Sequence, residues 1–209
     1  MKNAQRTGQL GKAIERTLWC VVACCALLFP PFAAAQAPAA EITLLRLDRT
    51  EEGVLLSANV AFEVPAIIDD ALAKGIPMFF VAEAVLFRDR WYWYDKQVAA
   101  AARHMRLSYQ PLTRRWRLVV SPTPIGNSGL AFGQTFETRE EALAAVQRVS
   151  RWKIAEFADL DPDQRYNVDF RFRLDVSQLP RPFQIGAVGH ADWNITAMRN
   201  LRLGLESAR

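Results

Sequence analysis

The chain has 209 residues, about half of them hydrophobic, and a formal net charge of +4 from 26 Lys and Arg against 22 Asp and Glu. Four of the basic and one of the acidic residues lie in the first 35 positions, so the remainder carries 22 basic and 21 acidic side chains. That balance gives no electrostatic reason to expect a nucleic-acid partner.

The N-terminus has the pattern of a cleavable export signal. A basic start precedes an apolar run of twelve residues from Leu18 to Phe29, which is too short to span a bilayer. The small residues Ala33-Ala34-Ala35 form a cleavage site. We therefore predict a signal peptide at 1–35 with cleavage before Gln36, a short linker at 36–40, and a periplasmic location.

All three cysteines, Cys20, Cys24 and Cys25, lie inside this apolar run. The predicted mature chain of 174 residues then has no thiol, which excludes disulfides, thiolate metal sites and cysteine nucleophiles. The residues before Cys24 loosely resemble a lipoprotein cleavage box. We favour the non-lipidated form, because the apolar run before Cys24 is very short and continues past it.

Strands are predicted along most of the remaining chain, from alternation of apolar and polar residues or from unbroken apolar runs. The run from Ile76 to Phe87 contains one charge, Glu83, which is typical of a strand covered on both faces. With the aromatic residues that follow, we interpret 75–96 as a central hairpin around which the other elements pack. The predicted strands span residues 42–48, 54–64, 76–87, 91–94, 98–109, 115–121, 166–176 and 193–198.

The segment 98–109 is ambiguous, since four consecutive alanines also allow a helix. We favour a strand, because small alanine side chains would fit opposite the large aromatic residues at 91–94.

Two short helices are predicted between the strands. Pro65 opens the first and Gly75 ends it. Thr138 and Glu141 form a capping box for the second, whose buried side is expected to run from Ala142 to Val149. Loops are expected at 122–133 and 179–189.

The predicted fold is mainly β (α+β). Hairpins at short spacing favour an antiparallel β-sandwich, immunoglobulin-like in general architecture, with two short helices. No composition shift divides the chain, so we predict a single domain over 41–209.

No residue pattern has the strength of a catalytic or metal site, so we predict no catalytic residue, no metal and no cofactor. The two histidines, His104 and His190, are too few for a histidine-rich metal site. Ser150 and Lys153 match S-x-x-K, but the companion motifs of that serine chemistry are absent, and we interpret them as the basic end of the second helix. Ser128 lies in a glycine-rich turn.

An arginine- and aromatic-rich run is the candidate binding surface. Stacking and anion binding suit these residue types. Alternation places the two tryptophans on one face and the two tyrosines on the other, so one pair packs in the core and only the other can bind a partner. Packing of the run in the core is the alternative. The candidate binding residues are Arg88, Arg90, Trp91, Tyr92, Trp93 and Tyr94.

Several segments resemble a family of exported proteobacterial proteins, domain of unknown function 4390, which is also labelled proline-rich signal peptide protein. The similarity covers 41–198 and is carried by GIPMFFVAEAVLFRDRWYWYDK, RHMRLSYQPLTRRWRL, RWKIAE and NVDFRFRLDVSQLPRPFQIGAV. The resemblance implies no activity and no binding residue. It does imply an association with a membrane sensor kinase, because genes of the family often lie beside one.

The sequence thus favours a non-enzymatic periplasmic binding or adaptor protein. Its expected partner is an envelope or inner-membrane protein, with the outer domain of a sensor kinase as the proposed example. Two alternatives stay open. One is a carrier that binds a lipid or small apolar ligand in a cavity lined by Met78 to Phe87, and the other is a hydrolase that uses Ser128 or Ser150. Contact with lipid is also left open.

Overall fold

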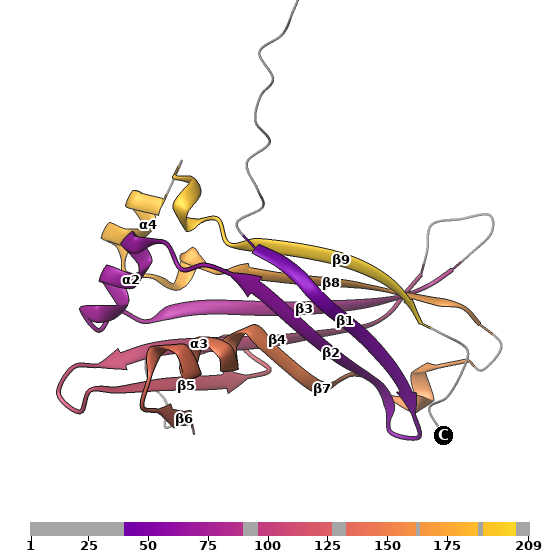
Figure 1. Ribbon diagram of the computed structural model, residues 1–209. Coiled ribbons are helices and arrows are strands. Elements are labelled where there is room, and N and C mark those ends of the chain that lie inside the picture. The colour runs from indigo at the N-terminus through magenta and orange to yellow at the C-terminus, as the bar shows by residue number, and fades with distance from the viewer. Residues whose placement is uncertain (1–39, 90–95, 127–132, 162–163, 188–189, 204–209) are drawn as a thin grey trace, which may run out of the picture. The chain divides into compact units, whose positions relative to one another are not determined.

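Figure 1 shows the arrangement of strands and helices in a computed structural model of the protein. The structure describes residues 40–89, 96–126, 133–161, 164–187 and 190–203. The described strands are β1 (Ala40–Thr50), β2 (Gly53–Phe62), β3 (Met78–Arg88), β4 (Lys96–Gln110), β5 (Arg115–Ser121), β6 (Gly133–Phe136), β7 (Arg148–Ala155), β8 (Tyr166–Leu174) and β9 (Thr196–Leu203). The described helices are α2 (Ala66–Ala73), α3 (Arg139–Gln147) and α4 (Arg181–Ala187), with the single 3-10 turns η1 (Phe157–Asp159), η2 (Val176–Gln178) and η3 (Ala191–Trp193).

The strands form two antiparallel sheets, of order β1-β2-β7 and β6-β5-β4-β3-β8-β9. Residues of both sheets share one hydrophobic core. At its centre the ring of Phe62 on β2 lies 5.6 Å from that of Phe80 on β3 and 5.5 Å from that of Phe172 on β8. The predicted mainly β fold, with antiparallel sheets facing one another across a core, is confirmed.

The middle strands of the larger sheet show the burial that their sequences predict. β3 lies between β4 and β8, and each residue from Met78 to Ala82 is buried. β8 instead alternates, with every second residue buried from Tyr166 to Leu174. A strand with apolar residues on both faces is therefore central, and the alternating strand beside it has one solvated face.

The two predicted helix starts are confirmed. Pro65 is the N-cap of α2, and Gly75 follows its end with φ +81 and donates its N–H to the carbonyl of Leu72 at 2.8 Å. Glycine adopts that left-handed conformation without the strain a side chain would add. In α3, Oγ1 of Thr138 accepts the N–H of Glu141 at 3.2 Å.

The predicted extent of the second helix is wrong. α3 ends at Gln147, and the residues expected to continue it form β7, which pairs with β2. Val149, expected on the buried side of the helix, is buried as a strand residue opposite Ala58. A strand forms here in place of the helix for two reasons. β2 offers a row of backbone hydrogen bonds, and Val149, Trp152 and Ile154 are good strand formers.

The last third of the chain contains helical turns that the sequence analysis missed. The segment 179–189, predicted as a loop, contains α4, with a proline at its second residue where a missing N–H costs nothing. The last strand begins at Thr196, after η3, and not at Trp193. A further short strand, β6, follows the predicted loop at 122–133 and pairs with β5.

Asp175 caps η2, and this arrangement predicts a pH-dependent contribution to stability. Its Oδ1 accepts the N–H and hydroxyl of Ser177 at 3.2 and 2.6 Å, and its Oδ2 accepts the amide of Gln178 at 2.9 Å. Burial opposes the charged form, but these hydrogen bonds and the charge of Arg173 outweigh it, so the pKa of Asp175 lies below its ordinary value.

A carboxylate whose pKa is lowered by folding stabilises the protein above its unfolded pKa of about 3.9. That contribution is lost as the pH falls through the folded pKa. We expect Asp175→Ala to lower the free energy of unfolding by about 1 kcal/mol at pH 7, and by clearly less at pH 3. Urea unfolding at both pH values measures the difference. Asp70→Ala, at an exposed position in α2, is the control, and an equal pH dependence in both variants would refute the expectation.

Candidate functional site

The hairpin of β3 and β4 brings the described part of the predicted binding surface to one end of the larger sheet. Arg88, the last residue of β3, pairs with Lys96 on β4 and with Tyr166 on β8, and it is partly exposed. Of the candidate binding residues, Arg88 is the one whose position the structure describes. The others lie outside the described residues, and their role stays a prediction: Arg90, Trp91, Tyr92, Trp93 and Tyr94.

The alanines of β4 lie opposite a different partner from the one expected. The strand itself is confirmed, but 99–102 pair with 83–86 of β3, not with the aromatic residues. The register follows from the other end of the hairpin, where Leu107 pairs with Met78 and both are fully buried. A shift of one residue would turn Leu107 out of the core.

The first half of β4 has a strand on one side only. β5 pairs with 104–110 of β4 and does not reach 96–103, which pair with β3 alone among the described residues. Figure 1 shows β5 and β6 at the left-hand end of the sheet, while β3 and β4 continue to the right. We call the eight residues 96–103 the free edge of β4.

Two adjoining hollows lie along this free edge, one facing the end of β7 and the other facing Asp159 and Asp161. One, of about 320 Å³, is lined by 98–100 of β4 and by 153–156 across from them. The other, of about 250 Å³, reaches Arg88 and Tyr166. We call the two hollows together the β4 groove, because they share the lining residues Val98 and Asp159.

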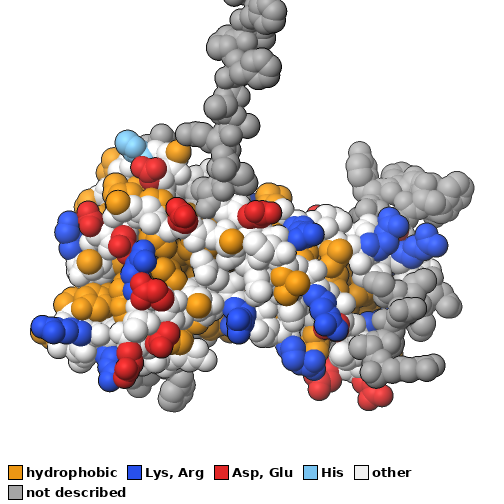
Figure 2. All heavy atoms as spheres, in the orientation of Figure 1, with side chains coloured by type: hydrophobic (Ala, Val, Ile, Leu, Met, Phe, Trp, Pro, Cys, Tyr) orange, Lys and Arg blue, Asp and Glu red, His pale blue; other side chains and the backbone are white. Residues whose placement is uncertain are grey.

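The charges around the β4 groove differ in how far they are already paired. Nζ of Lys153 lies 2.7 Å from a carboxylate oxygen of Glu156, and the hydrogen bond that Lys153 donates to Glu156 raises the pKa of Lys153. Arg88 and Lys96 form no ion pair within the described part of the chain, so their charges remain available to a ligand. Figure 2 shows basic side chains at the right-hand end of the molecule, where β3 ends.

Arg103, at the end of the free edge, was missed by the sequence analysis. Alternation along β4 places it on the same face as Ala101 and the buried Met105, beside Ala82 of β3. It is half-buried, and burial lowers the pKa of its guanidinium. Its Nε is buried with no hydrogen-bond partner among the described residues. Such a group favours an added acceptor.

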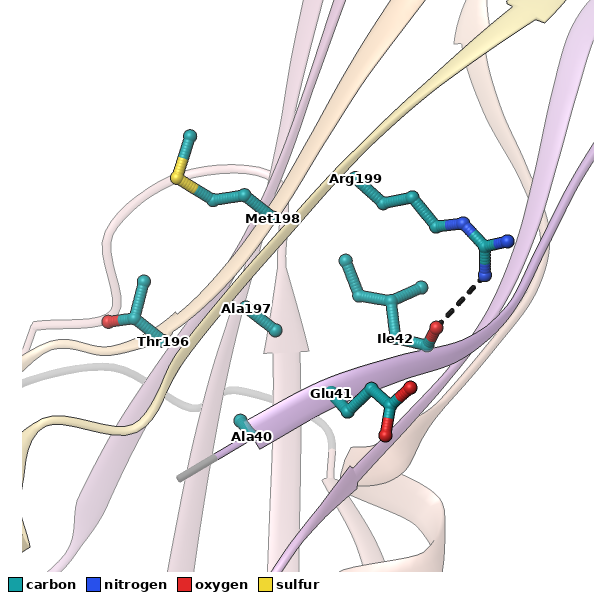
Figure 3. A pocket seen from close by; sticks show the side chains of 7 residues that line it. All are labelled: Ala40, Glu41, Ile42, Thr196, Ala197, Met198 and Arg199. Atoms are coloured by element: carbon teal, nitrogen blue, oxygen red, sulfur yellow. Dashed lines mark hydrogen bonds between the residues drawn. The ribbon is translucent and has the colours of Figure 1, made fainter. Parts of the chain in front are cut away.

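A third hollow, of about 400 Å³, lies between β1 and β9, the edge strands of the two sheets (Figure 3). Nη1 of Arg199 donates to the carbonyl of Ile42 at 3.0 Å and so bridges the sheets. Met198 points away from β1 in Figure 3 and is 70% exposed. The charge of Arg199 is already directed at a carbonyl, so this hollow offers fewer free groups than the β4 groove.

A family model described as Domain of unknown function (DUF4390) matches residues 37–201. The chain belongs to this family. The match covers more than three quarters of the chain and includes every residue named above as lining the β4 groove. No curated protein and no solved structure matches the chain.

In this DUF4390 domain the S-x-x-K pair lies on β7, so the prediction that it ends a helix is wrong. Ser150 is exposed, and Lys153 is held by Glu156. A strand does not give the one-turn spacing by which a helix brings such a pair together. Ser128 lies outside the described residues.

The described part of the DUF4390 domain contains no group of three or more His, Cys, Asp or Glu residues that could hold a metal ion. His104 lies within β4, and His190 is the N-cap of η3. Among the same residues, no helix is long and apolar enough to cross a membrane.

Proposed function

We propose that this DUF4390 protein is a non-enzymatic periplasmic adaptor that binds an envelope or inner-membrane protein at the β4 groove. The observation that carries the proposal is the free edge of β4, a row of backbone groups with no strand beside it among the described residues. Proteins usually block such edges, and an open edge beside a groove is suited to binding another chain. The predicted signal peptide at 1–35 supports the periplasmic location.

The outer domain of a membrane sensor kinase stays the predicted partner. That expectation depends on the gene arrangement of the family and not on the geometry of the groove. The groove adds a requirement of its own, because Arg88 and Lys96 favour a partner with acidic groups near this end of the sheet.

The packing of β3 supports an adaptor over a carrier. Phe80, Ala82 and Leu86 are no more than 1% exposed and belong to the shared core. None of the three hollows described above is lined by residues from Met78 to Phe87. A ligand between the sheets would have to separate side chains that are in contact, at the cost of their burial.

Site-specific photo-crosslinking tests the adaptor proposal. A photo-reactive residue at Ala100, which is exposed and lines the groove, is introduced into the full chain expressed with its own signal. We expect irradiation of cells to link it to an envelope protein, identified by mass spectrometry. The same residue at Leu112, which is fully exposed in the turn between β4 and β5, is the control and should give no such adduct.

Equal adducts from both positions, or none from Ala100 in a folded and exported chain, would contradict the proposed function. The mass of the periplasmic protein tests the location separately, because cleavage before Gln36 leaves 174 residues.

A further inference from the structure

The middle of the free edge of β4 lacks the devices that protect edge strands. Such edges are usually very short, or carry proline, several lysines, a pronounced bulge or an inward-pointing charge. Here one lysine, Lys96, lies at the start, a register shift lies near Val98, and Arg103 is a charge on the core face at the far end. The next four residues are alanines with unbroken pairing to β3. At about 3.3 Å per residue, the eight residues offer roughly 26 Å of edge.

The small side chains of 99–102 would not obstruct a further strand beside β4. Alanine fills little space on either face, so the side chains of an added strand would meet no bulky neighbour on β4 between Ala99 and Ala102. The side chains of the added strand that point to the core would enter the hollow of about 320 Å³ between β4 and β7. The facing wall includes Ile154 and Ala155, which suits apolar side chains at the centre of the added strand.

The charges indicate where an acidic residue belongs on that strand. Glu156 and Asp159 line the middle of the groove and would repel a second carboxylate there. Lys96, at the other end of the edge, is exposed, so solvent weakens its attraction for a carboxylate. Arg103 lies beyond the two acidic residues, half-buried, with Nε unpartnered among the described residues. A carboxylate is the acceptor that fits a guanidinium best, because it can take two parallel hydrogen bonds.

We propose that the free edge of β4 binds an extended peptide segment of the partner protein as an additional strand. The segment is about eight residues long, matching the edge. It carries apolar side chains at its centre and one Asp or Glu opposite Arg103. This inference rests on the proposed function and defines the kind of segment that the partner supplies.

A synthetic peptide series tests the inference on the purified mature protein. The probe is a fluorescein-labelled eight-residue peptide of alternating valine and threonine with glutamate at one end, made with the glutamate at either terminus because both strand directions are allowed. We expect one of the two peptides to bind in fluorescence anisotropy. The same peptide with lysine in place of the glutamate should bind with an affinity at least roughly tenfold lower. Hydrogen exchange should slow at the amides of 96–103 and not in β1.

Two variants separate the charge contact from the strand pairing. Arg103→Gln should remove most of the preference for glutamate over lysine while leaving the unfolding transition near that of the unchanged protein. Methylation of alternate peptide nitrogens along one side should abolish binding, and methylation along the other side should not, since an added strand pairs through one side. Arg106→Gln, on the opposite face of β4, is the matched control and should keep the preference.

The failures can be told apart. If no peptide of the series binds while Ala100 still crosslinks to an envelope protein, strand addition is wrong and the proposed function stands. If neither occurs, both are wrong. A third outcome is that, without peptide, protection of 96–103 from hydrogen exchange rises with protein concentration and analytical ultracentrifugation shows dimers. A second copy of this chain would then be the occupant, and the inference would be overturned.

Discussion

Phe172→Ala is expected to destabilise the protein by about 3–5 kcal/mol, the range for removing a buried phenylalanine ring. The ring is fully buried, stacks on Phe62 at 5.5 Å and on Phe80 at 5.8 Å, and so joins β8 to both β2 and β3. A cavity at that point removes contacts from both sheets at once. Since domains of this size are stable by about 5–15 kcal/mol, the loss is a large fraction of the total.

Thermal and urea unfolding of the purified mature protein measure this effect. The melting temperature should fall by on the order of 10 °C. Phe157→Ala is the matched control, because the same side chain is 51% exposed in η1 and its removal should change stability by less than about 1 kcal/mol. Equal losses from the two variants would show that the ring of Phe172 does not join the sheets.

Gly53→Ala is expected to cost about 2–5 kcal/mol, through backbone strain and a steric clash. Gly53 ends the turn between β1 and β2 with φ +122, where a side chain is strained. A Cβ atom there would lie 2.0 Å from the carbonyl oxygen of Ala155, which is backbone and cannot rotate away. The substitution therefore pushes β7 from β2 and weakens the pairing of Val54 with Ala155.

The same unfolding measurements, with hydrogen exchange at the amides of β7, check this prediction. Exchange should accelerate most at 152–155, near the displaced carbonyl. Gly126→Ala is the control, because a Cβ atom at Gly126 would meet nothing within 4 Å. Unchanged stability of Gly53→Ala would mean that the turn and β7 do not hold one another in place.

The parts of the fold that local sequence determines could be predicted. β8 was found from strict alternation, and every second residue from Tyr166 to Leu174 is buried. The predicted strand ran on to 176, but the chain turns into η2 there. The starts of α2 and α3 followed from Pro65 and Thr138, because capping involves residues within one turn of each other.

The errors fall where distant pairing decides the structure. The sequence predicts the end of the second helix at 148–153, but these residues belong to β7 because β2 lies beside them. The N–H of Arg151 bonds to the hydroxyl of Ser57, which is 94 residues away, and no local pattern carries that information. Nor does one show where β5 stops pairing with β4, so the free edge and Arg103 could not be found from the sequence.

The candidate site was therefore predicted in part. Arg88, one of the candidate binding residues, lines the β4 groove, and its role in binding stays a prediction. The wall formed by 153–156 was not expected, because the sequence predicts the end of the second helix at Lys153 and no strand directly after it. Two of the β4 alanines, Ala99 and Ala100, line the groove, whereas the sequence predicts that they lie opposite aromatic rings.

The bridge between Arg199 and the carbonyl of Ile42 sets a limit on when the protein can finish folding, because it joins residues 157 positions apart. β1 emerges first from any pore that threads the chain from its N-terminus, but its contact with β9 must wait until nearly the whole chain has passed. Structures with such distant pairings fold slowly. The contact between β1 and β9 therefore forms last, and a chain stopped before residue 196 would leave β1 paired with β2 alone.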